Sequence, residues 1–457
     1  MSTYSEEIAA YIARLSFADL PPEVVEKGKH LFLDTLGVMI LGAETAWSRS
    51  VFNYFSDQGG VPEAEVVYYG VRLPAASAAF VNGTMAHSFD YDDDLAACHV
   101  ACCVIPAALA AAQKVRASGK DLLTAIAIGY DVTVRLAETL DGHHLYAMGF
   151  HPTPVCGTYG ATAAVSKILG LSSEQIADAL GIAGSYLSGS LEWVSDGSMT
   201  KRFHGGKSAS EGILACSLAK RGFTGPRSIF EGSNGIFRMY QRQRDPRMLV
   251  EGLGERFDIL KSYLKWYPCC TCNAPLVDAL LEIRQESRLA PEDILDIEVR
   301  MRKTCMALVG EPLEKKQNPQ TILDAQMSAP YCAAVALLEG RLFPAQFTPE
   351  KIQDPKVQAL MKTVRVLWAP DLDVQGSPRP VPAEVNIKLS DGRSFSKRVD
   401  YQKGTYRHPL TFSEVVEKFR NCVGDKWPRE RTGLLISQIE GLEKIPDANR
   451  IRVSQTA

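Results

Sequence analysis

The chain has 457 residues and a formal net charge of −3, with 46% hydrophobic and 23% charged residues. That length predicts two or three domains, and the composition is typical of a soluble globular protein. Because acidic and basic residues are mixed along the chain, a nucleic-acid-binding arm and a membrane-surface helix are both excluded.

The N-terminal segment and the cysteines predict a cytoplasmic protein. Residues 1–25 contain an amphipathic helical pattern and then Pro21-Pro22, which starts the next helix. They lack the basic and apolar regions of a signal peptide. No apolar run reaches the roughly 18 to 20 residues that span a membrane. Eleven cysteines, an odd number, argue against a secreted disulfide framework.

The first part of the chain, to about residue 265, is predicted to be helical. Its segments follow the 3.6-residue period and are rich in Ala, Gly and Leu, and Ser172 with Gln175 forms a capping box. The small residues predict close helix packing in a mostly buried bundle. The expected helices include 24–41, 104–115, 121–140, 154–169, 174–184 and 206–221.

After Pro268 the pattern changes to strands interleaved with helices. A helix at 413–421 is expected to return to the first part of the chain. The sequence therefore predicts a mainly α fold, with a large all-helical domain over 1–266, rejoined by 401–457, and a smaller α/β (α+β) domain over 267–400. Expected in the smaller domain are helices 276–286, 329–338 and 357–360, and strands 294–303, 364–368, 385–389 and 395–399, with a hairpin turn at 390–393.

The stretch from Thr84 to Leu109 holds the densest group of titratable residues. An apolar run from Val104 should desolvate the carboxylates and raise their pKa values, and crowded like charges should keep some of them protonated. This pattern indicates proton-transfer chemistry more than a solvated acidic loop. The residues concerned are Asp90, Asp92, Asp93, Asp94, His87 and His99.

Two later segments add candidate site residues. His151 lies in a proline-flanked stretch just before a helix, where its imidazole stays available near a positive helix end. Lys201, Arg202 and His204 precede Gly205-Gly206 and another expected helix, and these cations beside free N–H groups predict an anion site.

Lys265 lies at the predicted domain boundary, where it can close onto a substrate carboxylate. The cysteines suggest a metal site as an alternative, since Cys269 and Cys272 have CxxC spacing. The second group, Cys98 with Cys102-Cys103, lacks that spacing, so we expect buried, inert thiols and no metal.

Together these motifs resemble the MmgE/PrpD family, which includes 2-methylcitrate dehydratase, cis-aconitate decarboxylase and iminodisuccinate epimerase. The resemblance covers almost the whole chain, and the order and spacing of the motifs make it specific. It implies a large helical domain, a smaller α/β lid domain, a homodimer and no cofactor. The motifs include LDTLG at 33–37, GTMAHSFDYDD at 83–93, FHPTPVCGTYGA, TKRFHGGKSASEG, KWYPCC, DAQMSAPY at 324–331 and HPLT at 408–411.

The resemblance also implies roles for particular residues. Asp90 resembles the family's first active-site aspartate, His99 the histidine that closes that motif, and His151 the histidine before the proline-rich helix start. Lys201 and Lys265 resemble two lysines that face substrate carboxylates. The wider predicted substrate-binding set adds Asp94, His204 and Tyr331.

The chain departs from the family pattern at several positions. Asp94 replaces a Thr or Ser, and its added negative charge should disfavour a highly anionic tricarboxylate. The usual HPS reads His99-Val100-Ala101. Cys270 stands where decarboxylase-like members have a histidine, and Ala274 replaces the histidine of THPA.

We therefore expect a cofactor-independent lyase that acts on a small di- or tricarboxylate by proton transfer next to a carboxylate. His151 is the expected main proton-transfer group, with Asp90 orienting or tuning His99. Dehydration of the 2-methylcitrate type is the first prediction, an epimerase or isomerase the second and decarboxylation the third. A metal-dependent hydro-lyase and a non-catalytic binding protein are the alternatives from other classes.

Overall fold

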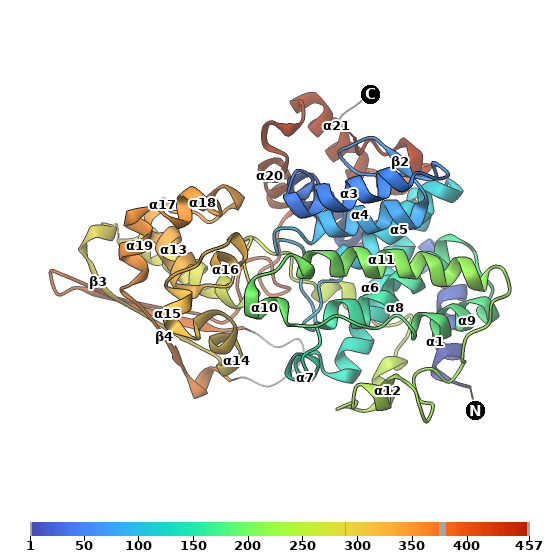
Figure 1. The fold of residues 1–457 in the computed structure, drawn as a ribbon, viewed down its shortest axis with the longest axis horizontal. Helices are drawn as coiled ribbons and strands as arrows, with labels where there is room; N and C mark the ends of the chain where they lie inside the picture. Colours follow the sequence, from blue (N-terminus) through green and yellow to red (C-terminus); the bar gives the residue numbers. More distant parts are fainter. Residues whose placement is uncertain (1, 288, 374–380, 455–457) are drawn as a thin grey trace. The chain divides into compact units, whose positions relative to one another are not determined.

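The computed structural model describes residues 2–287, 289–373 and 381–454 (Figure 1). The chain divides into two compact units, the first formed by residues 1–88, 92–262 and 411–457 and the second by Phe89–Tyr91 and Tyr263–Leu410. The short segment Phe89–Tyr91 therefore packs with the second unit, although the residues on either side of it belong to the first. The predicted mainly α fold with a smaller α/β part is confirmed.

The first unit is helical apart from one short antiparallel ladder, β1 (Ala64–Glu65) with β2 (Arg72–Leu73). Among its described residues, no helix combines the length and apolar character needed to cross a bilayer, and the same holds for the second unit. Its helices are α1 (Tyr4–Arg14), α2 (Pro22–Gly42), α3 (Ala46–Gln58), α4 (Ala75–Ala86), α5 (Ala101–Val115), α6 (Gly119–Leu140), α7 (Gly142–Ala147), α8 (Pro152–Ile168), α9 (Ser173–Ala183), α10 (Trp193–Asp196), α11 (Thr200–Ala219), α12 (Ile236–Met239), α20 (Phe412–Val423) and α21 (Arg429–Glu440).

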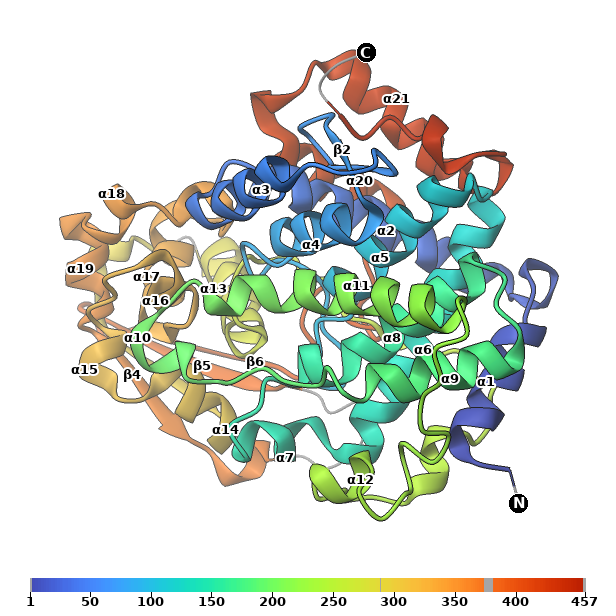
Figure 2. The same ribbon diagram turned by 45° about the vertical axis from the view of Figure 1, so that its right-hand side comes forward.

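The long helices of the first unit have local start signals and apolar surfaces that pack together. The capping box predicted at Ser172 and Gln175 is confirmed at the start of α9, and Ser118 with Asp121 forms another at α6. Helix α11 packs against α4, α5 and α8, and Figure 2 shows it running alongside α4. At the other side α20 packs on α2, where a buried ion pair joins Lys418 Nζ to Asp34 Oδ1 at 2.7 Å.

The start of α11 corrects one expectation from the sequence. The helix begins at Thr200, so Lys201, Arg202 and His204 lie inside its first turns and not ahead of it. Gly205 and Gly206 lie within the helix. Their lack of a side chain allows close contact with α4 and α5, since a Cβ at Gly205 would lie 2.8 Å from the Cys102 Sγ. The two glycines therefore serve helix packing and do not form a loop for anions.

The second unit contains a four-stranded sheet with the order β4-β3-β5-β6. Strands β3 and β4 are parallel and the other two pairs are antiparallel. The predicted strands and hairpin are confirmed, with Gly392 in the turn at a φ of 88°. Helices α13 and α17 pack against the sheet (Figure 2). The strands are β3 (Ile294–Met301), β4 (Val364–Trp368), β5 (Ala383–Leu389) and β6 (Ser394–Val399), and the helices are α13 (Ala274–Ser287), α14 (Lys303–Cys305), α15 (Leu313–Lys316), α16 (Ile322–Gln326), α17 (Ala329–Glu339), α18 (Pro349–Ile352) and α19 (Pro355–Met361).

The contact between α4 and α11 predicts opposite effects for two glycine substitutions. A methyl group at Gly206 would collide with the carbonyl oxygen of Phe80 and lie 2.6 Å from Thr84 Oγ1. Gly206→Ala should therefore lower the free energy of unfolding by at least about 2 kcal/mol. Gly433→Ala, in the open on α21, should raise it by about 0.5 to 1 kcal/mol. Urea unfolding of both variants tests this, and an unchanged midpoint for Gly206→Ala would contradict it.

Candidate active site

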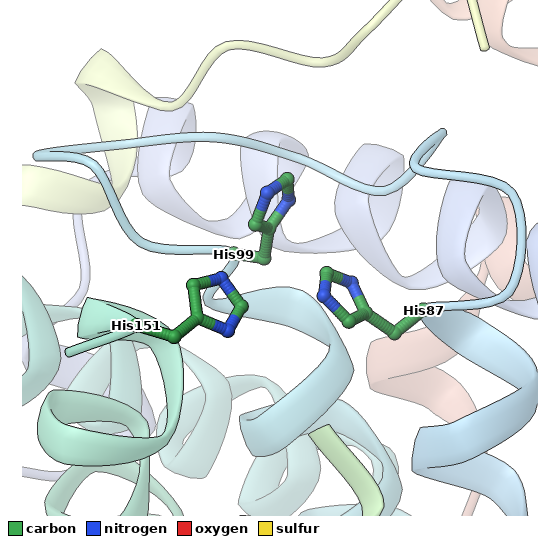
Figure 3. A group of neighbouring side chains, drawn as sticks. All are labelled: His87, His99 and His151. Carbon is green, nitrogen blue, oxygen red and sulfur yellow. The ribbon is translucent and has the colours of Figure 1, made fainter. Parts of the chain in front are cut away.

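Three imidazoles from separate segments lie together in the first unit (Figure 3). His87 ends α4, His99 lies in the loop before α5, and His151 caps the start of α8. Their side chains are buried, and the His87 ring centroid lies 4.7 Å from that of His99 and 5.8 Å from that of His151. A cluster of this kind, away from water, can hold or move a proton.

Asp92 connects two of these rings. Its Oδ2 lies 2.8 Å from His87 Nδ1, and its Oδ1 lies 3.4 Å from His99 Nδ1. His99 Nδ1 makes a shorter contact, 2.9 Å, with the carbonyl oxygen of Asp93. Burial lowers the pKa of His87 to about 3, so this ring is neutral near pH 7. Burial alone would raise the pKa of Asp92, but the neighbouring His87 and His99 imidazoles hold it well below its usual range.

His151 and His204 form a second pair, with 2.9 Å between their Nδ1 atoms. One of these nitrogens must carry a proton and the other accept it, so the pair shares one proton when both rings are neutral. Burial lowers the pKa of His151 well below its usual value, and lowers that of His204 to about 4. Within the described residues, the Nε2 atoms of His151 and His87 are buried without a hydrogen-bond partner.

Two buried cations come from the first turn of α11. The Lys201 ammonium lies 5.5 Å from the centre of the Trp193 ring, and its charge adds to burial in lowering the pKa values of His87 and His151. Arg202 donates to the backbone carbonyl of His87 at 3.3 Å. The imidazole cluster therefore has a positive charge beside it, which suits an anionic ligand or a developing negative charge.

Asp93 differs from Asp92 in its partners. Its Oδ1 accepts from the Ala101 N–H at 2.8 Å, which fixes the start of α5, and its Oδ2 accepts from the Tyr130 hydroxyl at 2.7 Å. Burial raises the pKa of Asp93 to about 7. The expectation that burial raises carboxylate pKa values thus holds for Asp93 and is wrong for Asp92, because imidazoles surround Asp92. Asp94 is half-buried.

In the second unit, Asp90 pairs with Lys265. The Lys265 ammonium lies 2.9 Å from Asp90 Oδ1 and 3.1 Å from its backbone oxygen, and both side chains are buried. Asp90 has a φ of 51°, a left-handed conformation that costs a non-glycine residue energy. Gln326 holds the same segment by donating to the Phe89 carbonyl. Within the first unit, Asp92 contacts His99, with its Oδ1 at 3.4 Å from the Nδ1 atom.

The remaining residues singled out from the sequence are Tyr331 and the cysteines. Tyr331 is buried in α17, and its hydroxyl donates to the Gln346 carbonyl at 2.6 Å. Ten of the eleven cysteines are buried, as expected, and Cys270 is half-buried. A hydrogen bond from Cys272 lowers the pKa of the Cys270 thiol.

Among the described residues, the side chains placed to hold a metal are mainly histidines and aspartates, and one of these sets includes Cys102 from the second cysteine group. Among the described residues of the first unit, one nitrogen from each of His87, His99 and His151 lies within 4.8 Å of the others. His87, Asp92 and Cys102 form a second such set. Three imidazoles are a suitable ligand set for a zinc-like ion, so metal content is a necessary measurement on this protein.

His87 and Asp92 belong to the predicted titratable group but had no individual role in it, and Tyr130 was not among the candidate residues. His87 and Asp92 lie five residues apart in one motif, and this spacing was the available signal for their pairing. Tyr130 carries no local signal, because α6 is nearly all buried and only the folded chain brings its hydroxyl to Asp93.

The raised pKa of Asp93 predicts a pH-dependent stability difference. Since the folded-state pKa of about 7 exceeds the unfolded value, the contribution of the Asp93 carboxyl group to stability should fall as pH rises from 5 to 7. Asp93→Asn removes this dependence, so over that range the variant should gain about 2 kcal/mol relative to wild type. Urea unfolding at pH 5, 6 and 7 measures the difference, with the exposed Asp425→Asn as control. Parallel curves for wild type and Asp93→Asn would disprove the shift.

Comparison with known proteins finds relatives named as decarboxylases and dehydratases. It is 29% identical over 465 residues to a human protein named cis-aconitate decarboxylase, covering 98% of this chain and 94% of the relative. A protein of the same name from Aspergillus terreus is 26% identical, with 98% and 94% covered. The 2-methylcitrate dehydratase of Escherichia coli is 22% identical, with 63% and 61% covered.

Two family models match in succession. The MmgE/PrpD N-terminal domain matches residues 6–249, and the MmgE/PrpD C-terminal domain matches residues 267–440. Decarboxylases and dehydratases of this kind are both lyases. The resemblance drawn from the motifs is thereby confirmed, and the chain belongs to the MmgE/PrpD family.

Proposed function

We propose that this protein is a lyase that acts on a small di- or tricarboxylate through a carbanion next to a carboxylate. The observation that carries the proposal is the buried histidine cluster, in which the His87 and His151 imidazoles are neutral, beside the Lys201 cation. Neutral imidazoles accept protons, and a nearby ammonium stabilises the negative charge that appears on a carboxylate when its neighbouring carbon loses a proton.

The first candidate reaction is dehydration. A neutral imidazole takes the proton from the carbon next to the carboxylate, and the electron pair of that bond forms the enolate-like anion. The anion then expels hydroxide, which leaves as water with a proton from an acid on the enzyme. The imidazolium that forms when a ring takes the substrate proton is suited to supply it. The absence of histidine at Cys270 and Ala274 also separates this chain from the decarboxylase-like pattern.

The second candidate reaction is decarboxylation. The likeness to proteins named cis-aconitate decarboxylase extends over 98% of the chain, against 63% for the dehydratases, and this favours loss of carbon dioxide. In that reaction the electron pair of the broken carbon–carbon bond stays on the substrate, and a proton from the enzyme replaces the departing group. Lys201 would stabilise the same anion in both reactions.

Proton NMR in D₂O distinguishes these reactions on one panel of substrates: 2-methylcitrate, citrate, isocitrate, cis-aconitate, malate and iminodisuccinate. New olefinic signals without carbon dioxide mean dehydration, and carbon dioxide with a shortened product means decarboxylation. Deuterium incorporation with a changed diastereomer would identify the epimerase that the sequence offers as runner-up. No reaction from folded protein with any member would contradict the proposed substrate class.

The proposed role of Lys201 predicts a loss of turnover on removing its charge. Lys201→Met should lower kcat/KM by at least about 100-fold, because the ammonium stabilises the anion more than the substrate. Lys220→Met, at the exposed end of the same helix, is the matched control and should keep wild-type values. Wild-type kinetics for Lys201→Met would remove this lysine from the mechanism.

The role of Lys265 stays a prediction from the resemblance. Because Lys265 pairs with buried Asp90, Lys265→Met alone would leave a buried carboxylate without this cation. The double variant Asp90→Asn with Lys265→Met avoids that effect. It should bind substrate at least about 10-fold more weakly, as measured by calorimetry, if the lysine holds a carboxylate. An unchanged affinity would rule that role out.

A further inference from the structure

We propose that His87 is a second proton-transfer group of this site, a base whose tautomer is fixed by Asp92 as a positioning residue. This inference deepens the proposed lyase function and rests on it. It assigns a role to two residues for which the family resemblance implied none.

The hydrogen bond to Asp92 determines which nitrogen of His87 carries the proton. An ionised carboxylate only accepts hydrogen bonds, so the 2.8 Å contact requires a proton on Nδ1 of His87. In the neutral ring this leaves the lone pair on Nε2.

The Nε2 atom of His87 has no hydrogen-bond partner among the described residues. A buried polar atom without a partner is unfavourable for folding, and in a cluster of titratable side chains it is available to a ligand. The Nε2 atom of His151 is in the same condition. Figure 3 shows these two rings lying beside one another beneath His99, so both Nε2 atoms belong to one cluster.

Asp92 is suited to positioning because it serves two rings at once. Its second oxygen lies 3.4 Å from Nδ1 of His99, and that nitrogen also donates to the Asp93 carbonyl. Both imidazoles are thus held with their Nδ1 protons toward Asp92 and the Asp93 backbone. When His87 accepts a proton on Nε2, the imidazolium that forms is stabilised by the carboxylate on its other side.

The proton balance needs a single group. His87 Nε2 takes the proton from the carbon next to the substrate carboxylate, and that bond's electrons form the anion. The His87 imidazolium then gives this proton to the departing hydroxide, which leaves as water. His87 is neutral again when the product leaves, so no other reactant is consumed.

The tautomer is tested by NMR on protein labelled with ¹⁵N-histidine, independently of any substrate. Long-range ¹H–¹⁵N spectra at pH 7 should show His87 neutral with its proton on Nδ1, assigned by the signals missing in His87→Asn. Asp92→Asn should abolish the exclusive Nδ1–H tautomer. A wild-type His87 that is protonated on Nε2, or on both nitrogens, would overturn the assignment.

The catalytic role is tested by deuterium incorporation into whichever panel member the wild type converts. His87→Asn retains an N–H donor for Asp92 and lacks the base, so kcat should fall at least about 100-fold with KM within about threefold. Asp92→Asn should lower kcat by about 10- to 100-fold. His144→Asn, a half-buried histidine outside the cluster, should leave both values unchanged. Wild-type incorporation by folded His87→Asn would disprove the role of His87.

Zinc titration by calorimetry tests whether Nε2 of His87 is a metal ligand instead of a base. Stoichiometric binding that His87→Asn abolishes would make Nε2 a metal ligand and overturn its assignment as a base. If the wild type converts no panel member, the proposed function fails, whereas the tautomer spectra still decide the role of Asp92. The two failures are therefore distinguishable.

Discussion

The candidate site depends on the burial of one carboxylate, Asp92, between two imidazoles. An isolated buried carboxylate would be costly, and the N–H groups of His87 and His99 offset that cost by favouring its ionised form. In return Asp92 orients both rings. The contacts of Asp92 with His87 and His99 hold the loop from His87 to Val100 in place. Asp93 contributes as well, because it accepts hydrogen bonds from the first N–H of α5 and from the Tyr130 hydroxyl.

The packing of the helices explains why this cluster is dry. Helices α4, α5, α8 and α11 contact one another closely, and glycines such as Gly205 and Gly206 remove the side chains that would keep them apart. The histidines occupy the ends of these helices and the loop between α4 and α5. Exclusion of water keeps the rings neutral and increases the effect of the Lys201 charge, since electrostatic interactions are stronger at low dielectric.

Membership of the MmgE/PrpD family limits the candidate reactions to those of its lyases and does not identify the substrate. Relatives matched over nearly the whole chain have names of decarboxylases, while those matched over part of it have names of dehydratases. Both reactions pass through an anion next to a carboxylate, which is what a buried lysine beside neutral imidazoles can stabilise. The leaving group depends on where the proton-transfer groups lie relative to the substrate, and this is why the orientation of His87 matters.

The sequence by itself determined the helical and strand segments, because periodicity, capping boxes and the hairpin turn are local signals, as at Ser172 and Gly392. It also identified the titratable motif from His87 to His99, because those residues are close in the chain. Only the tertiary structure decided the pairings. His151 contacts His204, and the Tyr130 hydroxyl donates to Asp93. Helix α11 begins six residues earlier than expected. Each of these features depends on contacts between segments far apart in sequence.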